Sequence, residues 1–90
     1  MRITIDNLVF DRAKYDADAD VLYLGRGSSN AAVDTAQTRE GHGIRYGSGG
    51  EVIGVTIINA KWLLDRDGYL KITIPHEVRV QPDELAAALA

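Results

Sequence analysis

The stretch from Glu51 to Ala60 constrains the fold of this chain more than any other part of its sequence. Most of its residues are β-branched and apolar, and such residues are stiff at χ1 and pack well on a pleated surface, so the stretch predicts a β-strand. Its apolar residues divide between the two faces of that strand: Ile53, Val55 and Ile57 on one, and Val52 and Ile58 on the other. A strand that is apolar on both faces is expected to be central and covered on both sides.

The residues before this strand predict its first partner. The turn Gly47–Gly50, with the sequence Gly-Ser-Gly-Gly, separates it from the apolar segment Ile44–Tyr46. Short apolar runs on both sides of a glycine-rich turn indicate a β-hairpin. Further upstream, Ala31–Thr38 has Val33 as its only large apolar residue and predicts an edge strand.

A short helix is expected directly after the central strand. Asn59 can accept hydrogen bonds from backbone N–H groups at the start of a helix, and Gly68 suits the left-handed conformation that ends one. The intervening segment Ala60–Arg66 gives about two turns, which cannot be stable alone, so we expect Trp62 or Leu63 to pack on the sheet. Trp62 is interpreted as a core anchor rather than as a ligand contact.

The remaining segments predict strands, a turn and a second helix. Apolar residues alternate or cluster at Ile3–Ile5, Val21–Leu24 and Tyr69–Ile74, and Pro75 is expected to end the last strand. Aspartates at positions 16, 18 and 20 indicate a turn, and Pro82 followed by two acids indicates a helix start. The predicted fold is a single α+β domain, residues 1–90: a mostly antiparallel β-meander of about six strands, with a short helix after the central strand and a C-terminal helix.

Composition excludes several classes of function. Ten basic and thirteen acidic residues give a net charge of −3, which disfavours nonspecific nucleic-acid binding. There is no cysteine, so disulfides and thiolate metal sites are excluded. The N-terminal residues alternate apolar and polar side chains, unlike a signal peptide, and no apolar run approaches the length of a membrane span. We therefore expect a cytoplasmic protein with no membrane contact.

The acidic turn has the one-three-five spacing of a calcium loop at Asp16, Asp18 and Asp20. Such a loop also requires glycine at its sixth position and glutamate at its twelfth, where this chain has Val21 and Gly27. The sequence therefore favours a solvated turn, with no metal site and no cofactor.

Two histidines are considered as candidates for acid–base chemistry. His42 lies between two glycines and is expected to be mobile and exposed. His76 precedes Glu77, but adjacent residues on a strand point to opposite faces. No nucleophile or orienting third group accompanies either histidine, so no catalytic residue is assigned. The four tyrosines could form a stacking platform for single-stranded nucleic acid, although the acidic charge favours partly buried tyrosines instead.

Three segments together resemble a known family. The segments Tyr15–Leu24, Gly50–Ala60 and Tyr69–Pro75 are similar to the signatures of the small prokaryotic domain of unknown function numbered 2283. This chain departs from the family pattern at Thr56, where relatives usually carry an acid, and in its hairpin turn, which is usually acidic. The resemblance implies no established activity, although some members look like partners of small putative toxins.

Two hypotheses of function follow. The first is a noncatalytic protein-interaction module, an antitoxin-like or regulatory partner of a small toxin, which associates with itself as a homodimer or with a small protein partner. Unpaired sheet edges recruit strands, and the edge at Ala31–Thr38 or the apolar face beside it would form the contact. The second is a small enzyme or ligand-binding domain that uses His42 or His76 with nearby acids. A cleft containing a histidine and an acid would favour the second hypothesis.

Overall fold

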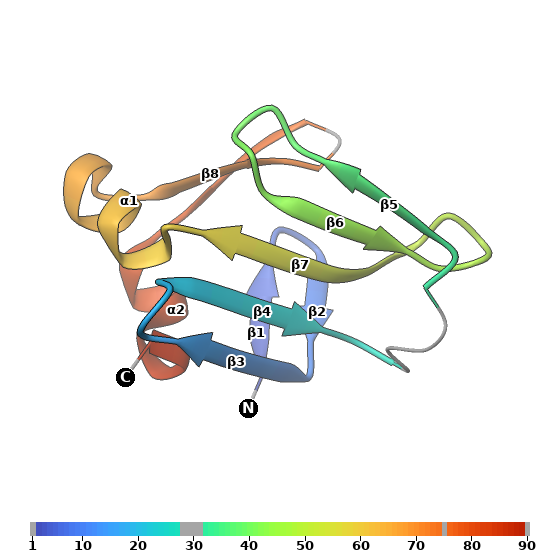
Figure 1. The fold of residues 1–90 in the computed structure, drawn as a ribbon, viewed down its shortest axis with the longest axis horizontal. Helices are drawn as coiled ribbons and strands as arrows, with labels where there is room; N and C mark the ends of the chain where they lie inside the picture. The colour runs from blue at the N-terminus through green and yellow to red at the C-terminus, as the bar shows by residue number, and fades with distance from the viewer. Residues whose placement is uncertain (1, 28–31, 75, 90) are drawn as a thin grey trace.

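A five-stranded antiparallel sheet forms the centre of the molecule (Figure 1). The computed structural model describes residues 2–27, 32–74 and 76–89. Within these residues the elements follow in the order β1 (Ile3–Ile5), β2 (Leu8–Phe10), β3 (Arg12–Asp16), β4 (Val21–Gly25), β5 (Asp34–Gln37), β6 (Gly43–Tyr46), β7 (Val52–Ile58), α1 (Ala60–Asp67), β8 (Leu70–Thr73), β9 (Glu77–Val80) and α2 (Pro82–Leu89). The predicted α+β class, with a mainly antiparallel sheet, a short helix after the central strand and a C-terminal helix, is confirmed.

Strand β7 occupies the centre of this sheet, as its apolar sequence predicts. The strand order is β3-β4-β7-β6-β5, and every neighbouring pair is antiparallel. The β6–β7 hairpin closes through the glycine-rich turn, where Gly50 adopts a positive φ of 82°. The two shorter pairs, β1–β2 and β8–β9, form separate two-stranded sheets. The chain therefore does not form a single meander, because these hairpins leave the central sheet and pack against it.

The hydrophobic core lies on one face of the five-stranded sheet, which we call the inner face. Alternating residues of β4, β6 and β7 enter it, and β1–β2, β8–β9 and α2 supply the opposing layer; Figure 1 shows β1 and β2 behind the sheet. Members of this core that are almost fully buried include Ile5, Phe10, Leu22, Val55, Ile57, Leu70, Ile72 and Leu85. The side chains of Leu70, Ile72 and Ile74 are buried in the core, as predicted. Pro75, which was expected to end this strand, lies outside the described residues.

The other face of the sheet, which we call the open face, is covered by no element of the described chain (Figure 1). The expectation that both faces of β7 are covered is therefore wrong. The side chain of Ile58 projects from this face and is 39% exposed, and that of Tyr23 on β4 is 45% exposed. The β1–β2 and β8–β9 pairs and α2 all pack on the inner face instead.

Helix α1 forms where the sequence predicts it and ends as predicted at Gly68, which has a positive φ of 80° and donates its N–H to the Leu64 carbonyl. Of the two anchors expected for this helix, Leu63 packs against the core, but Trp62 does not, so its interpretation as a core anchor is wrong. Trp62 is 55% exposed and stacks against the Arg66 guanidinium, 4.6 Å from its ring centre, whereas Leu64 is buried in the core. The helix is therefore rotated so that Trp62 faces outward, and Leu63 is only half-buried.

In the part of the chain that the structure describes, no helix combines the length and the apolar character needed to cross a bilayer.

Candidate functional site

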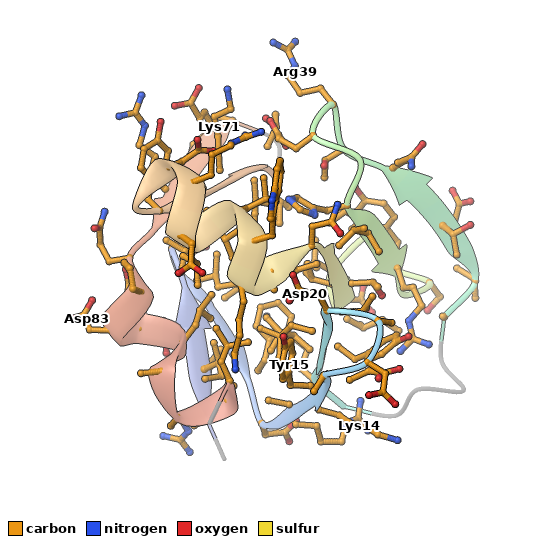
Figure 2. All side chains as sticks on the ribbon, turned by 60° about the vertical axis from the view of Figure 1, so that its left-hand side comes forward. Lys14, Tyr15, Asp20, Arg39, Lys71 and Asp83 are labelled. Carbon is orange, nitrogen blue, oxygen red and sulfur yellow. The ribbon has the colours of Figure 1, made fainter. Side chains whose placement is uncertain are left out.

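The acidic turn between β3 and β4 holds the start of α1. Asp20, at a positive φ of 55°, accepts hydrogen bonds from the backbone N–H of Lys61 at 2.8 Å and of Trp62 at 3.1 Å. The Tyr15 hydroxyl donates to the same carboxylate at 2.7 Å, and Figure 2 shows Tyr15 and Asp20 pointing toward one another beside α1. Asp20 thus caps the helix from a distant turn, because its carboxylate satisfies N–H groups that have no partner within the helix.

This arrangement replaces the cap expected at Asn59. Asn59 adopts the left-handed conformation with φ 58° and makes no side-chain capping bond. The sharp bend at Asn59 turns the chain from β7 into α1 and directs the free N–H groups toward Asp20. Asparagine and aspartate tolerate this conformation better than most residues.

The hydrogen bonds of this cluster shift two pKa values. Burial alone would raise the pKa of Asp20, but the hydrogen bonds from Tyr15, Lys61 and Trp62 outweigh it and lower that pKa. The hydrogen bond to Asp20, together with burial and the nearby negative charge, raises the pKa of Tyr15 to about 12. The cluster therefore stabilises a charged aspartate beside a neutral tyrosine, which is a structural role.

Asp20→Ala is expected to lower the free energy of unfolding by about 2 kcal/mol, because loss of a helix cap costs roughly 0.5–2 kcal/mol and the Tyr15 hydroxyl also loses its acceptor. Chemical denaturation monitored by circular dichroism measures this change. Asp18→Ala is the matched control, since Asp18 lies in the same turn and is exposed, and its expected cost is below about 0.5 kcal/mol. Equal losses in the two variants would contradict the assignment of Asp20 as the cap.

The other acids of the turn are used locally. The Asp16 carboxylate accepts from the backbone N–H groups of Asp18 at 3.1 Å and Ala19 at 3.4 Å. Asp20 is occupied by α1. In residues 2–27, 32–74 and 76–89, no cluster of three or more His, Cys, Asp or Glu residues could hold a metal ion. The three aspartates are thus distributed between a turn and a helix cap.

His42 lies at the border of the core rather than in an exposed loop. Only 1% of its surface is accessible, so the expectation of a mobile, exposed histidine is wrong. Its Nδ1 accepts the backbone N–H of Ile58 at 3.2 Å, and its own backbone N–H donates to the Thr38 hydroxyl at 3.1 Å. Its Nε2 is buried and makes no well-aligned hydrogen bond with the described residues, and the backbone of Lys71 is the polar group that acts on the ring there. His42 therefore ties the end of β7 to the start of β6.

The protonation state of His42 follows from these contacts. Because Nδ1 accepts a hydrogen bond, the neutral ring carries its proton on Nε2. Burial lowers the pKa of His42, although the charge of Glu40 and the backbone of Lys71 act in the opposite direction. The imidazole is consequently held neutral, and His42 also forms part of the lining of a small cavity.

That cavity, of about 400 Å³, lies between the β5–β6 loop, α1 and β8. Its ionisable lining residues are Arg39, Glu40, His42, Arg66, Asp67, Tyr69 and Lys71, of which Arg39 and Lys71 are labelled in Figure 2. Both acids are already paired: Glu40 accepts the N–H and hydroxyl of Thr73, and Asp67 pairs with Arg66 at 2.8 Å. Burial alone would raise the pKa of Glu40, but those bonds from Thr73 lower it. The cavity therefore holds a neutral histidine beside acids that are already bonded elsewhere.

The second histidine belongs to a different region. The side chain of His76 is 72% exposed, and its Nε2 lies 3.7 Å from Asp6, while Glu77 pairs with Arg79. The structure thus does not bring His76 and Glu77 together as an acid–base couple. Of the four tyrosines, Tyr15, Tyr46 and Tyr69 are half-buried as predicted, and Tyr23 alone is exposed.

The open face of the sheet carries candidate binding residues that the sequence interpretation missed. The register places Arg12 and Lys14 of β3, Tyr23 of β4, Arg45 of β6 and Ile58 of β7 on this face. A signal was present in the alternation of Arg12, Lys14 and Asp16 with less polar residues, which is the period-two pattern of a half-buried strand. The aspartates of the following turn obscured it, because they suggested a longer connection.

Comparison with known proteins connects this sheet to a family. A family model described as "Protein of unknown function (DUF2283)" matches residues 12–61, more than half of the chain. The matched segment contains all five strands of the central sheet and the residues that cap α1. No curated protein and no solved structure matches the chain.

Proposed function

The chain belongs to the DUF2283 family of proteins of unknown function, and we propose that it is a noncatalytic protein-interaction module whose contact surface is the open face of the central sheet. The observation that carries this proposal is the distribution of its layers. The β1–β2 and β8–β9 pairs and α2 pack on the inner face, while the open face is covered by no element of the described chain. Tyr23 and Ile58 lie on it with 45% and 39% of their surfaces exposed.

These two residues are suited to binding a protein surface. Tyrosine supplies a large contact area at a low cost in conformational entropy, and its hydroxyl can pair with polar groups. Ile58 extends the apolar area at the end of β7, beside the half-buried Thr56. Cations at Arg12, Lys14 and Arg45 border this area, which favours a partner with acidic groups around an apolar centre.

The free edge at β5 is the weaker candidate for this contact. This strand is the last of the five-stranded sheet, as predicted, and all four of its residues are exposed. The pairing of Thr38 N–H with the His42 carbonyl implies that the N–H of Thr35 points outward, away from β6. The Asp34 carboxylate already accepts this N–H at 2.9 Å. A charged side chain over an outward N–H discourages the addition of another strand, so the open face is favoured.

The proposed partner is a small protein, either a second copy of this chain or a separate polypeptide. The family resemblance favours a small toxin as that separate polypeptide, with this chain as its antitoxin-like or regulatory partner. A noncatalytic role agrees with the pairing of Glu40 with Thr73 and of Asp67 with Arg66, which leaves no free acid in the histidine cavity.

Tyr23→Glu tests the contact surface. We expect it to weaken self-association, or binding to the product of an adjacent gene, by at least about tenfold, because it places a charge in the middle of an apolar contact. Sedimentation equilibrium at tens of micromolar measures this change. Val9→Glu is the control, since Val9 is 43% exposed and lies on β2, in the other layer of the molecule. The proposal would be contradicted if the wild-type chain stayed a strict monomer both alone and in the presence of the adjacent gene product. Equal effects of Tyr23→Glu and Val9→Glu would also contradict it.

A second candidate function, ligand binding in the cavity beside His42, is favoured by one observation. His42 lines the cavity of about 400 Å³, and its buried Nε2 makes no well-aligned hydrogen bond with the described residues. A small molecule with a hydrogen-bond acceptor could receive that N–H. Binding of such a ligand would change the imidazole signals of His42 in an NMR titration. The substitution Tyr23→Glu would leave the affinity for this ligand unchanged.

A further inference from the structure

A row of arginine and glycine residues crosses the open face of the sheet. In this row Arg12 pairs with Gly25, Gly25 with Gly54, and Gly54 with Arg45, so the four residues lie side by side on β3, β4, β7 and β6. The two glycines occupy the middle and the two arginines the flanks. A strip of backbone that carries no side chains of its own thus lies between two cationic residues.

The side chains of both arginines extend over the glycines on the open face. A Cβ atom added to Gly25 would lie 2.7 Å from Nη2 of Arg12, and one added to Gly54 would lie 2.7 Å from Nε of Arg45. Neither position has room for a side chain while the guanidinium groups remain where they are. Because Gly25 and Gly54 pair on strands only about 5 Å apart, the two guanidinium groups lie over neighbouring positions of the sheet.

The charges of this row are not neutralised within the described chain. The salt bridges there are Arg66–Asp67, His76–Asp6 and Arg79–Glu77, and none involves Arg12, Lys14 or Arg45. Lys14 lies in the next row, paired with Tyr23. Like charges held close together repel, and a bound anion removes that repulsion.

The row borders a shallow groove. This groove, of about 310 Å³, is lined by Arg12, Lys14, Tyr23, Gly25 and Arg45, together with Ala13 and Leu24. This volume is at the lower end of the range for small-molecule sites. All three ionisable side chains that carry charge at neutral pH in this lining are cationic, although the whole chain has a net charge of −3.

From this arrangement we propose that the groove binds the phosphate group of a small phosphorylated molecule. The forked guanidinium group matches the oxygens of a phosphate in a bidentate manner, and a lysine adds a point charge. Two arginines and one lysine favour phosphate over a carboxylate, which carries a single negative charge. The exposed ring of Tyr23 lines the groove beside them and can contact the organic part of the ligand. Phosphate binding would be a property of the isolated chain and does not require the protein partner proposed above.

Inorganic phosphate is the probe that tests this proposal. We expect titration of the folded protein, at constant ionic strength, to produce saturable shifts of the Gly25 and Gly54 amides and of the side-chain Nε–H signals of Arg12 and Arg45. The expected dissociation constant is on the order of 1 mM. Acetate in the same buffer should bind at least about tenfold more weakly, since it carries less charge.

Substitution of the glycines separates geometry from charge. Gly54→Ala keeps every charge but forces the flexible Arg45 side chain to move, so phosphate affinity should fall by about tenfold, as for the loss of one charged hydrogen bond. Gly43→Ala is the matched control on the same face, because its Cβ would make an ordinary 3.6 Å contact with Thr56. Arg45→Gln should weaken binding at least as much as Gly54→Ala. Its charge-matched control is Arg39→Gln, at the end of the molecule opposite Lys14 in Figure 2.

The outcomes are decisive when circular dichroism shows that each variant is folded. Loss of affinity in Gly54→Ala and Arg45→Gln, with both controls unchanged, supports the site. The proposal is overturned by shifts that do not saturate, by equal affinity for acetate and phosphate, or by equal effects of a variant and its control. If Gly54→Ala does not fold, Arg45→Gln and Arg39→Gln decide alone.

Discussion

Val55→Asp is expected to abolish folding. Val55 lies at the centre of the sheet, with Leu24 and Ile44 beside it on the two neighbouring strands, and is 2% exposed. An aspartate there would place an unpaired charge among apolar side chains, at a cost of several kcal/mol. That loss is comparable to the whole stability of a small domain, about 5–15 kcal/mol. The variant should show no cooperative thermal transition by circular dichroism.

Thr56→Asp provides the control for this prediction. Thr56 is the next residue of the same strand, but its side chain projects from the open face of the sheet and is half-buried. The charge introduced there can stay hydrated, so the expected loss is below about 1.5 kcal/mol and the transition should remain cooperative. If Val55→Asp melted like the wild type, or Thr56→Asp were the more damaging change, the assignment of inner and open faces would be wrong.

His42→Ala is expected to lower the free energy of unfolding by about 3 kcal/mol. The substitution removes a buried ring, leaves a cavity, and deprives the Ile58 N–H of the Nδ1 atom that accepts it. For a chain of this size the melting temperature should fall by roughly 10–20 °C. Differential scanning calorimetry at pH 7.5 measures this effect. His76→Ala, a change at an exposed histidine, should leave the transition within about 0.5 kcal/mol of the wild type.

The same histidine should make stability depend on pH. The folded state lowers the pKa of His42 from its ordinary value of 6.5, so the unfolded chain binds a proton more readily. The contribution of His42 is therefore fully present above pH 6.5 and is lost as pH falls below that value. The difference in stability between wild type and His42→Ala should shrink from pH 7.5 to pH 5. A difference that stayed constant, or grew, would show that His42 is not held neutral.

The locally determined parts of the fold could be predicted from the sequence. The hairpin turn at Gly47–Gly50 and the end of α1 at Gly68 each depend on glycines that adopt positive φ, and glycine does so without strain. The central position of β7 follows from its β-branched residues. These features depend on neighbours within a few positions, so their signals are present in short stretches of sequence.

Features determined by distant residues were missed. The cap of α1 comes from Asp20, which lies 41 positions before Lys61, and no local pattern indicates that contact. His42 is flanked by glycines that suggest a mobile loop, yet its ring is buried because the end of β7 offers it an N–H from Ile58. Trp62 was expected in the core because of its size, but the orientation of α1 is set by Leu64.

The candidate surface was the least predictable part. Ile58 is apolar and was therefore assigned to a covered second face of β7. Which face of a sheet is covered depends on where the other elements pack, and here β1–β2, β8–β9 and α2 all pack on the inner face. The row from Arg12 to Arg45 exists only through the pairing of four strands. Its residues are too far apart in the chain for a sequence motif to reveal them.

The most direct test of the open face as an interaction surface uses two neighbouring isoleucines of β7. Ile57 is fully buried on the inner face, while Ile58 is 39% exposed on the open face. Methyl NMR spectra of the chain, recorded from 20 µM to 1 mM and then with the product of an adjacent gene (roughly the range over which weak to moderate protein contacts saturate), follow both residues at once. The account predicts a saturable shift of the Ile58 methyl signals with the Ile57 signals unchanged. Ile58 signals that stay unchanged in both experiments, or Ile57 and Ile58 signals that move together, would contradict it.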